Sequence, residues 1–320
     1  MKGPAKDILF GVAIGEAIGL PFESSERNDM LKYSDSNISG CNVYSQHQGM
    51  WSHSTALTFC MAESIIDGYD LETTAINFIG WKNKSLKRSD GYVFDHNNTT
   101  VKAICRLEKV MNQSLYTDTS IFSSTSDFDN SNGSLMRILP LLYVIRDKPI
   151  RVQFNIIWDN SALTHNHIRA AMCCMIYLKV AEHILHGHEK SDAYQQTRHE
   201  IKELWDGIDF DLNEIRYFER VIQSDIRNYS FEYLRSGEYV MDSLESSLWC
   251  LLKTDSYKGA IQKSINLGGN TSSTGAITGG LAGLYYGFKS IPDPWIRTLS
   301  KRSYILKLAN RLDLTFSKRA

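Results

Sequence analysis

Glycines at four-residue intervals near both ends of the chain are the feature that most restricts its fold. They stand at positions 11, 15 and 19 in GVAIGEAIG and at positions 275, 279, 283 and 287 in GAITGGLAGLYYG. Residues four apart share one face of an α-helix, so each set gives its helix a stripe without side chains. Glycine inside a helix costs about 0.5–1 kcal/mol relative to alanine, and such a set needs a compensating reason. We expect the two helices to cross backbone to backbone in the core. A ligand lying directly on the glycine backbone is the alternative.

Apolar residues recur at helical steps through most of the remaining chain. This spacing predicts helices over residues 8–19, 55–67, 71–84, 99–112, 134–146, 168–186, 192–206, 212–224, 243–252, 256–266 and 275–288. Alternating strand patterns are scarce, and short segments rich in Ser, Asn, Asp and Gly separate the helices. No linker, repeat or low-complexity block divides the chain. The sequence therefore predicts an all-α fold, with residues 1–320 forming a single compact helical domain.

Composition and charge exclude several classes of function. The chain is 42% hydrophobic and 22% charged, as expected for a packed core. Its 35 basic and 36 acidic residues give a formal charge of −1, which argues against general nucleic-acid binding. Asp7 and Glu16 interrupt the apolar N-terminal run, so we expect neither a signal peptide nor a membrane span. The six cysteines lack C-x-x-C spacing and are expected to be free, mostly buried thiols of a cytoplasmic protein.

The stretch GMWSHSTALTFC places four small polar residues where a helix is expected to begin. Ser52 or Ser54 would cap that helix, a contribution of about 1 kcal/mol. His53 beside the serines also suggests a nucleophile and its base, but neighbours in sequence rarely face each other and no third member is evident. We favour the cap. Glu23, in GLPFE after the first glycine helix, is expected on its own to be a solvated loop carboxylate.

Three further polar clusters precede apolar-periodic segments. The loop Asn132-Gly133-Ser134 turns backbone N–H groups outward and favours phosphate, although the same residues make ordinary turns and caps. The segment 164–167, THNH, carries two histidines that could bind a metal, but no further ligand is in view and capping is the simpler reading. The segment 268–274, GGNTSST, forms an anion-friendly nest before the second glycine helix.

Taken in order, these segments resemble the ADP-ribosylglycohydrolase family, the relatives of dinitrogenase reductase-activating glycohydrolase and the ADP-ribosylarginine hydrolases. GVAIGEAIGLPFE is similar to the family's opening helix and the glutamate after it. WSHST is similar to W/Y-T-D-D-T, NGSLMRILP to N-G-x-x-M-R-x-x-P, and LTHNHIRA to the T-H loop. The segment 239–287, from YVMDSLESS to GLYYG, is similar to the family's long C-terminal signature, and within it GGNTSSTGAI matches the usual core G-G-D-T-D-T-x-G-A-I. The resemblance runs from residue 8 to about residue 290 and implies the family's all-α fold.

The same resemblance exposes a departure at the metal ligands. The acids of the two family motifs hold two magnesium ions, and here they are replaced by His53, Ser54, Asn270 and Ser272. Magnesium prefers charged carboxylate oxygens and disfavours imidazole nitrogen. Glu23 is the one acid that the match leaves at the centre. We therefore predict that the two-magnesium site does not form and that the chain has no metal cofactor.

The resemblance also implies residues that would hold ADP-ribose. Asn132, Gly133 and Ser134 match the phosphate-facing loop, and His165 matches the T-H position. Neutral donors from the two altered motifs would offer hydrogen bonds to a diphosphate that carboxylates would repel. These donors are Ser52, Ser54, Asn270, Thr271, Ser272 and Ser273, the last standing where the family has threonine.

Three functions remain open at this point. The leading hypothesis is a pseudoenzyme: a catalytically impaired family member that binds ADP-ribose or an ADP-ribosylated partner. The second is an active hydrolase that removes ADP-ribose from a modified side chain by a rearranged or metal-independent site, with His53 as general base and Glu23 as its partner. The third is a structural protein, because the family is similar to some lens crystallins. No membrane partner is expected for any of them.

Overall fold

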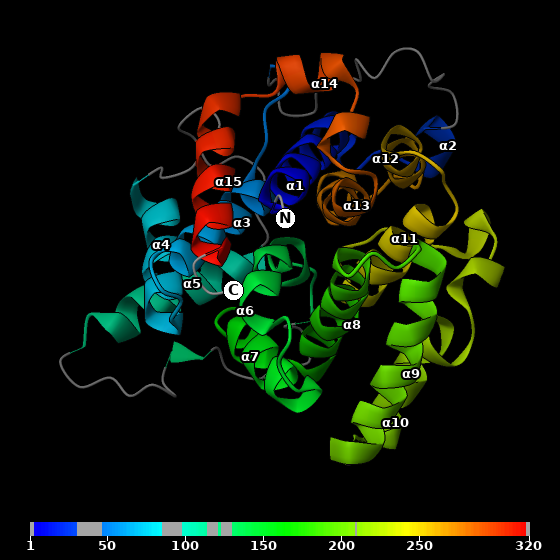
Figure 1. The fold of residues 1–320 in the computed structure, drawn as a ribbon, viewed down its shortest axis with the longest axis horizontal. Helices are drawn as coiled ribbons and strands as arrows, with labels where there is room; N and C mark the ends of the chain where they lie inside the picture. The colour runs from blue at the N-terminus through cyan, green and yellow to red at the C-terminus, as the bar shows by residue number, and fades with distance from the viewer. Residues whose placement is uncertain are drawn as a thin grey trace.

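The computed structural model describes residues 3–30, 47–84, 98–113, 121–122, 130–208 and 210–317. These residues form fifteen α-helices and no strand, which confirms the all-α prediction (Figure 1). The helices are α1 (Ala5–Gly19), α2 (Arg27–Met30), α3 (His53–Ile66), α4 (Leu71–Lys84), α5 (Asn98–Met111), α6 (Leu142–Ile145), α7 (Ile150–Ala162), α8 (Ile168–Leu185), α9 (Lys190–Ile208), α10 (Leu212–Ile215), α11 (Val240–Leu252), α12 (Tyr257–Ile265), α13 (Thr271–Tyr286), α14 (Asp293–Thr298) and α15 (Arg302–Ser317). One antiparallel bridge joins Ser131 to Tyr239.

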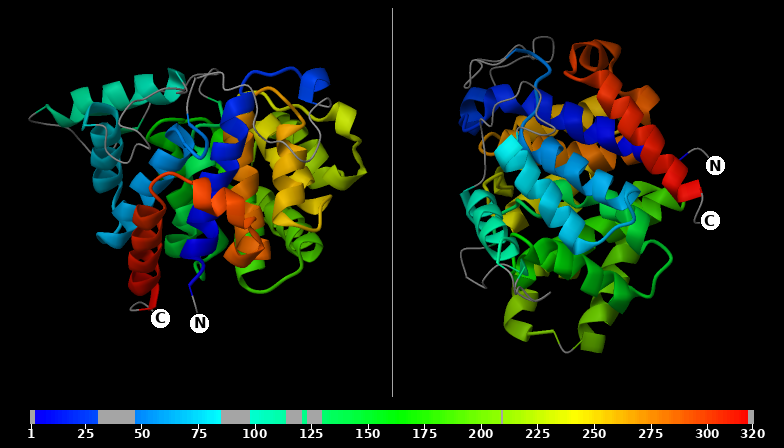
Figure 2. Two further views of the ribbon diagram at one scale, coloured as in Figure 1. Left: turned by 90° about the horizontal axis from the view of Figure 1, so that it is seen from above. Right: turned by 90° about the vertical axis from the view of Figure 1, so that its left-hand side faces the viewer.

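The two glycine helices, α1 and α13, run antiparallel and touch through their backbones (Figure 2). A methyl group built on Gly15 would lie 2.0 Å from the carbonyl oxygen of Gly275, and one on Gly11 would lie 2.3 Å from that of Gly279. One on Gly19 would lie 2.2 Å from the carbonyl oxygen of Thr271. Only glycine permits this approach along the full contact. The expected backbone-to-backbone crossing is confirmed, and the first turn of α13 lies beside the last turn of α1.

Other helices enclose this pair. The helix α8 packs against α7, α9, α11 and α13, and its residues 170–184 are buried on every face, as expected for a helix in the middle of the core. The helices α3 and α15 cover the other side of α1, and α12 packs on α13 (Figure 1). Within the described ranges, no helix is long and apolar enough to cross a membrane.

Charged side chains inside α8 are held by a local network. Lys179 Nζ lies 2.6 Å from Glu182 Oε2 and 2.7 Å from Glu200 Oε2 of α9. Burial would raise the pKa of Glu200, but hydrogen bonds with His183 and Lys179 outweigh burial and bring it to about 2. Gln153 of α7 donates to Glu182 Oε1 at 3.0 Å. The network ties α7, α8 and α9 together and lies apart from the polar motifs of the sequence.

The helix predictions for residues 134–146 and 212–224 were only partly right. The first stretch is two 3₁₀ turns, Leu135–Arg137 and Leu139–Leu141, followed by α6. Pro140 lacks the N–H that a continuous helix would use, so the chain turns there instead. The second stretch breaks into α10, a 3₁₀ turn at Arg216–Phe218 and a π-helical turn at Glu219–Gln223.

Four helices were not predicted at all: α2, α7, α14 and α15. The signal for α15 was present, because Ile305, Leu308, Ala309 and Leu312 follow the steps i, i+3, i+4 and i+7 and are all buried. Of the cysteines expected to be free thiols, those at 60, 105, 173, 174 and 250 are free, and four of these five are buried. Cys41 lies outside the described residues.

Replacing Gly15 by alanine tests the helix crossing. The new methyl group would collide with a backbone carbonyl that cannot rotate away, so we expect Gly15→Ala to lower the free energy of unfolding by about 3 kcal/mol or more. Gly237→Ala is the control, because its methyl group would meet a side-chain oxygen of Asp242 at an ordinary 3.4 Å. Urea unfolding of both variants measures the difference. Equal stability of the two would contradict the backbone contact.

Candidate functional site

The polar motifs of the sequence meet where two long helices begin. The helices α3 and α13 both start beside α1, which packs against each of them. The first residues of a helix carry N–H groups without helical partners and a partial positive charge. Two carboxylates, one on α1 and one just after it, satisfy these groups.

Glu16 of α1 caps α3. Its Oε1 accepts a hydrogen bond from the backbone N–H of Ser54 at 3.0 Å, and its Oε2 accepts one from that of Thr55 at 2.9 Å. The side chain is fully buried, so both oxygens obtain from the helix the hydrogen bonds they would otherwise obtain from water. From the sequence, Glu16 was expected only to interrupt the apolar N-terminal run. Its role depends on which face of α1 meets α3, and no motif records that.

Glu23 makes the equivalent contacts at the start of α13. Its Oε2 accepts from the backbone N–H of Ser272 at 2.8 Å, and its Oε1 accepts from the side-chain amide of Asn270 at 2.6 Å. The hydroxyl of Thr271 lies 3.4 Å from Oε2 but donates over the shorter distance, 2.8 Å, to the carbonyl of Gly19. Glu23 is 6% exposed, so the expectation of a solvated loop carboxylate was wrong. Glu23 is buried because the crossing of α1 and α13 places it against the start of α13.

The sulfur of Met136 lies between the two helix starts. The hydroxyl of Ser54 donates to it at 3.2 Å, and the hydroxyl of Ser273 approaches it at 3.9 Å. The next residue on each helix, Thr55 on α3 and Thr274 on α13, has a buried hydroxyl without a hydrogen-bond partner among the described residues. The region between α3 and α13 therefore contains neutral hydroxyls around a thioether.

Ser52 and His53 form the entrance to α3. Ser52 is the N-cap residue, and its hydroxyl accepts from the backbone N–H of His53. The Nδ1 atom of His53 lies 3.0 Å from the same hydroxyl, and the imidazole is 3% exposed. The expectation of a serine cap at this position is confirmed. The structure places His53 on a helix start, in a hydrogen bond with its own neighbour.

The loop at 132–134 is tied to the start of α13 and to α11. The side-chain amide of Asn132 donates to Asn270 Oδ1 at 2.8 Å and to Ser243 Oγ of α11 at 2.9 Å. Ser134 is fully buried and accepts a weak hydrogen bond from the thiol of Cys174, with the two atoms 3.6 Å apart. The side chains of Asn132 and Ser134 therefore already have partners inside the protein.

His165 lies directly against this loop as a neutral imidazole. Its Nε2 is 2.8 Å from Ser131 Oγ and its Nδ1 is 2.8 Å from Thr164 Oγ1. Burial, with a smaller effect of nearby Arg137, holds the pKa of His165 well below its usual range. A methyl group on Gly133 would lie 2.6 Å from the imidazole Cε1, so the glycine is required for this packing.

The two histidines of the 164–167 segment do not act as a pair. Both ring nitrogens of His165 are engaged with hydroxyl groups. His167 is the N-cap residue of α8, and its Nδ1 accepts from the backbone N–H of Arg169 at 3.1 Å. These contacts agree with the capping and core hydrogen bonding that we favoured over a metal site.

Arg137 holds the backbone of the loop at 132–134. Its Nη1 donates to the carbonyl of Gly133 at 2.7 Å and its Nη2 to that of Asn160 at 3.1 Å, and its guanidinium lies 4.8 Å from the ring centroid of Phe78. Burial lowers the pKa of Arg137 to about 10, so it remains a cation at neutral pH. Arg137 belongs to the motif NGSLMRILP, but the sequence alone predicted no role for it. The structure shows that it holds the loop backbone.

The donors at the centre do not fit two magnesium ions. The four positions that the family fills with carboxylates carry an imidazole, two hydroxyls and an amide, and Glu16 and Glu23 bind helix N–H groups. Across the described ranges, no three His, Cys, Asp or Glu side chains gather into a group that could hold a metal. Magnesium needs charged oxygen ligands to offset its dehydration. We therefore derive no chemical step through magnesium.

Comparison with known sequences establishes the family. The sequence model of ADP-ribosylglycohydrolase matches residues 4–320. The chain belongs to the ADP-ribosylglycohydrolase family, and the resemblance read from its motifs is confirmed.

Individual relatives are distant. The chain is 28% identical over 310 residues to the ADP-ribosylarginine hydrolase Tri1 of Serratia proteamaculans, covering 96% of this chain and 78% of the relative. It is 23% identical over 158 residues to Crystallin J1A of Tripedalia cystophora, covering 49% and 47%. A solved structure described as an ADP-ribosylglycohydrolase-related protein complex superposes with a TM-score of 0.77 at 21% identity, covering 98% of each chain. That structure shows that the two proteins share a fold.

Replacing Glu16 by glutamine tests the cap on α3. The amide nitrogen of glutamine would face one of the two N–H groups, leaving a buried donor unsatisfied, and the helix would lose its compensating negative charge. We expect Glu16→Gln to reduce the free energy of unfolding by about 2–4 kcal/mol. Urea unfolding of this variant beside Glu203→Gln, which changes an exposed glutamate of α9, measures the effect. Equal stability of the two variants would show that Glu16 is not a structural cap.

Proposed function

We propose that this chain binds ADP-ribose, free or attached to a partner protein, and does not hydrolyse it by a two-magnesium mechanism. One observation carries the proposal: the two central glutamates cap helices α3 and α13, and no carboxylate stands at the four replaced ligand positions. A member without these ligands lacks the means to orient an attacking water with metal ions. We therefore propose that it is a pseudoenzyme of the family.

The charge balance of the centre supports the binding of an anion. Glu16, Glu23 and Arg137 are the charged groups that the structure places beside the motifs. Four additional carboxylates, uncompensated by metal, would repel a diphosphate strongly at short range. Their replacement by neutral side chains removes four negative charges and leaves hydroxyl and amide donors near two helix N-termini. Metal-free binding of ADP-ribose thus becomes electrostatically possible where a carboxylate-rich centre would require magnesium.

Asn270 is the residue that we propose reaches the ligand first. It is partly exposed at the start of α13 and lies between Glu23 and Asn132. We propose Ser52 and His53 as further contacts, because they form the entrance to α3. The buried groups Ser54, Thr271, Ser272 and Ser273, and the loop 132–134 with His165, would take part by exchanging their present hydrogen bonds for ligand contacts.

A structural role is the second candidate. The observation that favours it is the saturation of the centre: Asn132 and His165 find hydrogen-bond partners inside the protein. A scaffold that no longer binds a nucleotide would be expected to close in this way. The similarity to Crystallin J1A concerns about half of each chain and is consistent with such a use of the fold.

An active, metal-independent hydrolase is the third candidate function, and it predicts turnover. The buried thiols fit a reducing compartment, and we propose that the chain works in the cytoplasm.

Titration calorimetry with ADP-ribose separates these readings. We expect binding whose Kd changes less than twofold between magnesium and a chelator, with no release of ADP-ribose from ADP-ribosyl-arginine in either condition. Asn270→Asp should weaken binding about tenfold in chelator, because it adds a negative charge beside the diphosphate. Asn266→Asp, the same change at the end of α12, serves as the control.

The opposing outcomes are distinct. Absence of binding under all conditions would favour the structural role. Turnover without magnesium would establish the rearranged hydrolase. Binding or turnover that requires magnesium would contradict the proposal outright.

A further inference from the structure

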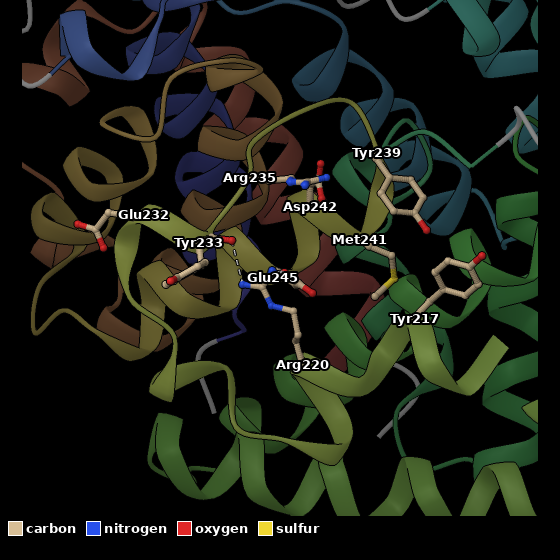
Figure 3. A pocket seen from close by; sticks show the side chains of 9 residues that line it. All are labelled: Tyr217, Arg220, Glu232, Tyr233, Arg235, Tyr239, Met241, Asp242 and Glu245. Carbon is tan, nitrogen blue, oxygen red and sulfur yellow. Dashed lines mark hydrogen bonds and ion pairs between the residues drawn. The ribbon is translucent and has the colours of Figure 1, made fainter. Parts of the chain in front are cut away.

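A cavity of about 340 Å³ lies against α11, and none of the residues implied to hold ADP-ribose lines it (Figure 3). Its walls come from the turns at 216–223, the segment 232–241 and the first two turns of α11. The side chains that line it are Tyr217, Arg220, Glu232, Tyr233, Arg235, Tyr239, Met241, Asp242 and Glu245. None of these residues was singled out by the motif comparison as a ligand-binding group.

Two carboxylates of the cavity, one buried and one partly buried, have few partners inside the protein. Asp242 and Glu245 are three residues apart on α11 and therefore lie on one face of that helix. Glu245 is 6% exposed, and its Oε2 forms an ion pair with Arg220 Nη1 at 3.2 Å. Apart from this ion pair, no hydrogen bond from another described residue reaches either carboxylate. Carboxylate oxygens with so few partners in a partly enclosed site favour a ligand rich in donors.

The charge of the lining favours a cation. Glu232, Asp242 and Glu245 provide three negative charges when ionised, and Arg220 and Arg235 provide two positive charges, a net of −1. Arg220 also has contacts outside the carboxylates. Its Nη2 donates to the carbonyl of Tyr233 at 3.1 Å, and its guanidinium lies 4.4 Å from the ring centroid of Tyr229.

Exposed aromatic rings surround the opening. Tyr217 is 37% exposed and Tyr233 is 71% exposed, and both line the cavity (Figure 3). Large exposed rings beside a pocket are typical of contact with another macromolecule. Tyr217 already carries one guanidinium on its ring, because Arg169 lies 3.6 Å from its centroid. Aromatic faces of this kind attract cations, and planar guanidinium groups stack on them well.

We propose that this cavity captures an arginine side chain on the surface of a protein partner. A guanidinium offers five N–H donors in one plane, which matches two carboxylates on adjacent turns of a helix. Its flat faces suit the tyrosines at the opening, whereas a lysine ammonium would satisfy fewer acceptors and stack less well. Asp242 and Glu245 receive the guanidinium, and Tyr233 covers it from outside. This capture does not require ADP-ribose at the centre, although the cavity wall adjoins the central loop through the bridge between Tyr239 and Ser131.

The protonation of Glu245 links this site to pH. Burial raises the pKa of Glu245 to about 7, against the opposing effect of Arg220 and with a further increase from Asp242. Arg235 also opposes the increase, and the buried thiol of Cys173 on α8 faces the same carboxyl. A bound cation requires the ionised carboxylate, so affinity should increase as the pH rises from 6 to 8.

Titration of the full chain with short capped peptides tests the proposal. The probe is acetyl-Gly-Arg-Gly-amide, compared with the same peptide carrying citrulline, which has the same shape without the charge, or lysine. We expect the arginine peptide to bind at least tenfold more tightly than the citrulline peptide and several-fold more tightly than the lysine peptide. Its affinity should increase between pH 6 and pH 8.

Variants locate the binding to the cavity. Glu245→Gln and Asp242→Asn should each reduce the affinity for the arginine peptide about tenfold, and the exposed Tyr233→Ala should reduce it several-fold without affecting the fold. Glu203→Gln on α9 should leave it unchanged. Thermal unfolding of each variant identifies losses that come from misfolding. Equal binding of arginine and citrulline peptides, equal binding of arginine and lysine peptides, binding of inorganic phosphate in their place, or no binding at all would each overturn the proposal.

Discussion

The contact between α1 and α13 determines where every other part of the centre lies. Because glycines line both helices, the backbone carbonyls of each helix lie in the space that a side-chain methyl group on the other would fill. The contact sets the antiparallel register, so the end of α1 meets the start of α13. Glu16 of α1 then lies against the start of α3, and Glu23 lies against the start of α13. One packing constraint thus fixes two buried carboxylates against two helix dipoles.

This arrangement has a direct chemical consequence. A buried carboxylate is stable when several donors satisfy it, and backbone N–H groups at a helix start are strong, fixed donors. In this chain Glu16 has both of its oxygens in such bonds, and Glu23 has one in such a bond and the other on Asn270. A magnesium ion would have to share these carboxylates with the helices and take its remaining ligands from neutral side chains. The family fold is retained around a centre whose charge has changed.

Part of this could be predicted from the sequence. The glycine spacing predicted the central crossing because a repeated gap in side chains has few other uses, and Ser52 was correctly expected at a helix start. The burial of the two glutamates could not be predicted from local sequence patterns. Glu23 was expected to be solvated when considered alone, and Glu16 was overlooked, because burial of either depends on which helix faces α1. The break of the helix predicted at 134–146 likewise depends on Pro140 and on tertiary contacts of the loop before it.

The cavity beside α11 could be predicted from the sequence even less than the burial of the two glutamates. Its lining combines residues from irregular turns with the first turns of a helix, and the turn at 219–223 has a π-helical geometry that apolar spacing does not reveal. Asp242 and Glu245 read as ordinary polar positions of an amphipathic helix in the sequence. Only the folded chain shows that they line one cavity, that Glu245 is paired with Arg220, and that two exposed tyrosines line the same cavity.

Manganese provides the most direct measurement of the central claim, because Mn²⁺ substitutes for Mg²⁺ at oxygen sites and has a strong paramagnetic resonance signal when free in solution. A titration of the full chain with Mn²⁺ in the presence of ADP-ribose, followed by electron paramagnetic resonance, counts the ions that become bound. We expect the signal of free Mn²⁺ to equal, at every addition, that of a protein-free sample with the same ADP-ribose. Loss of two equivalents of free Mn²⁺ per chain, with the coupled signal of two neighbouring ions, would contradict it.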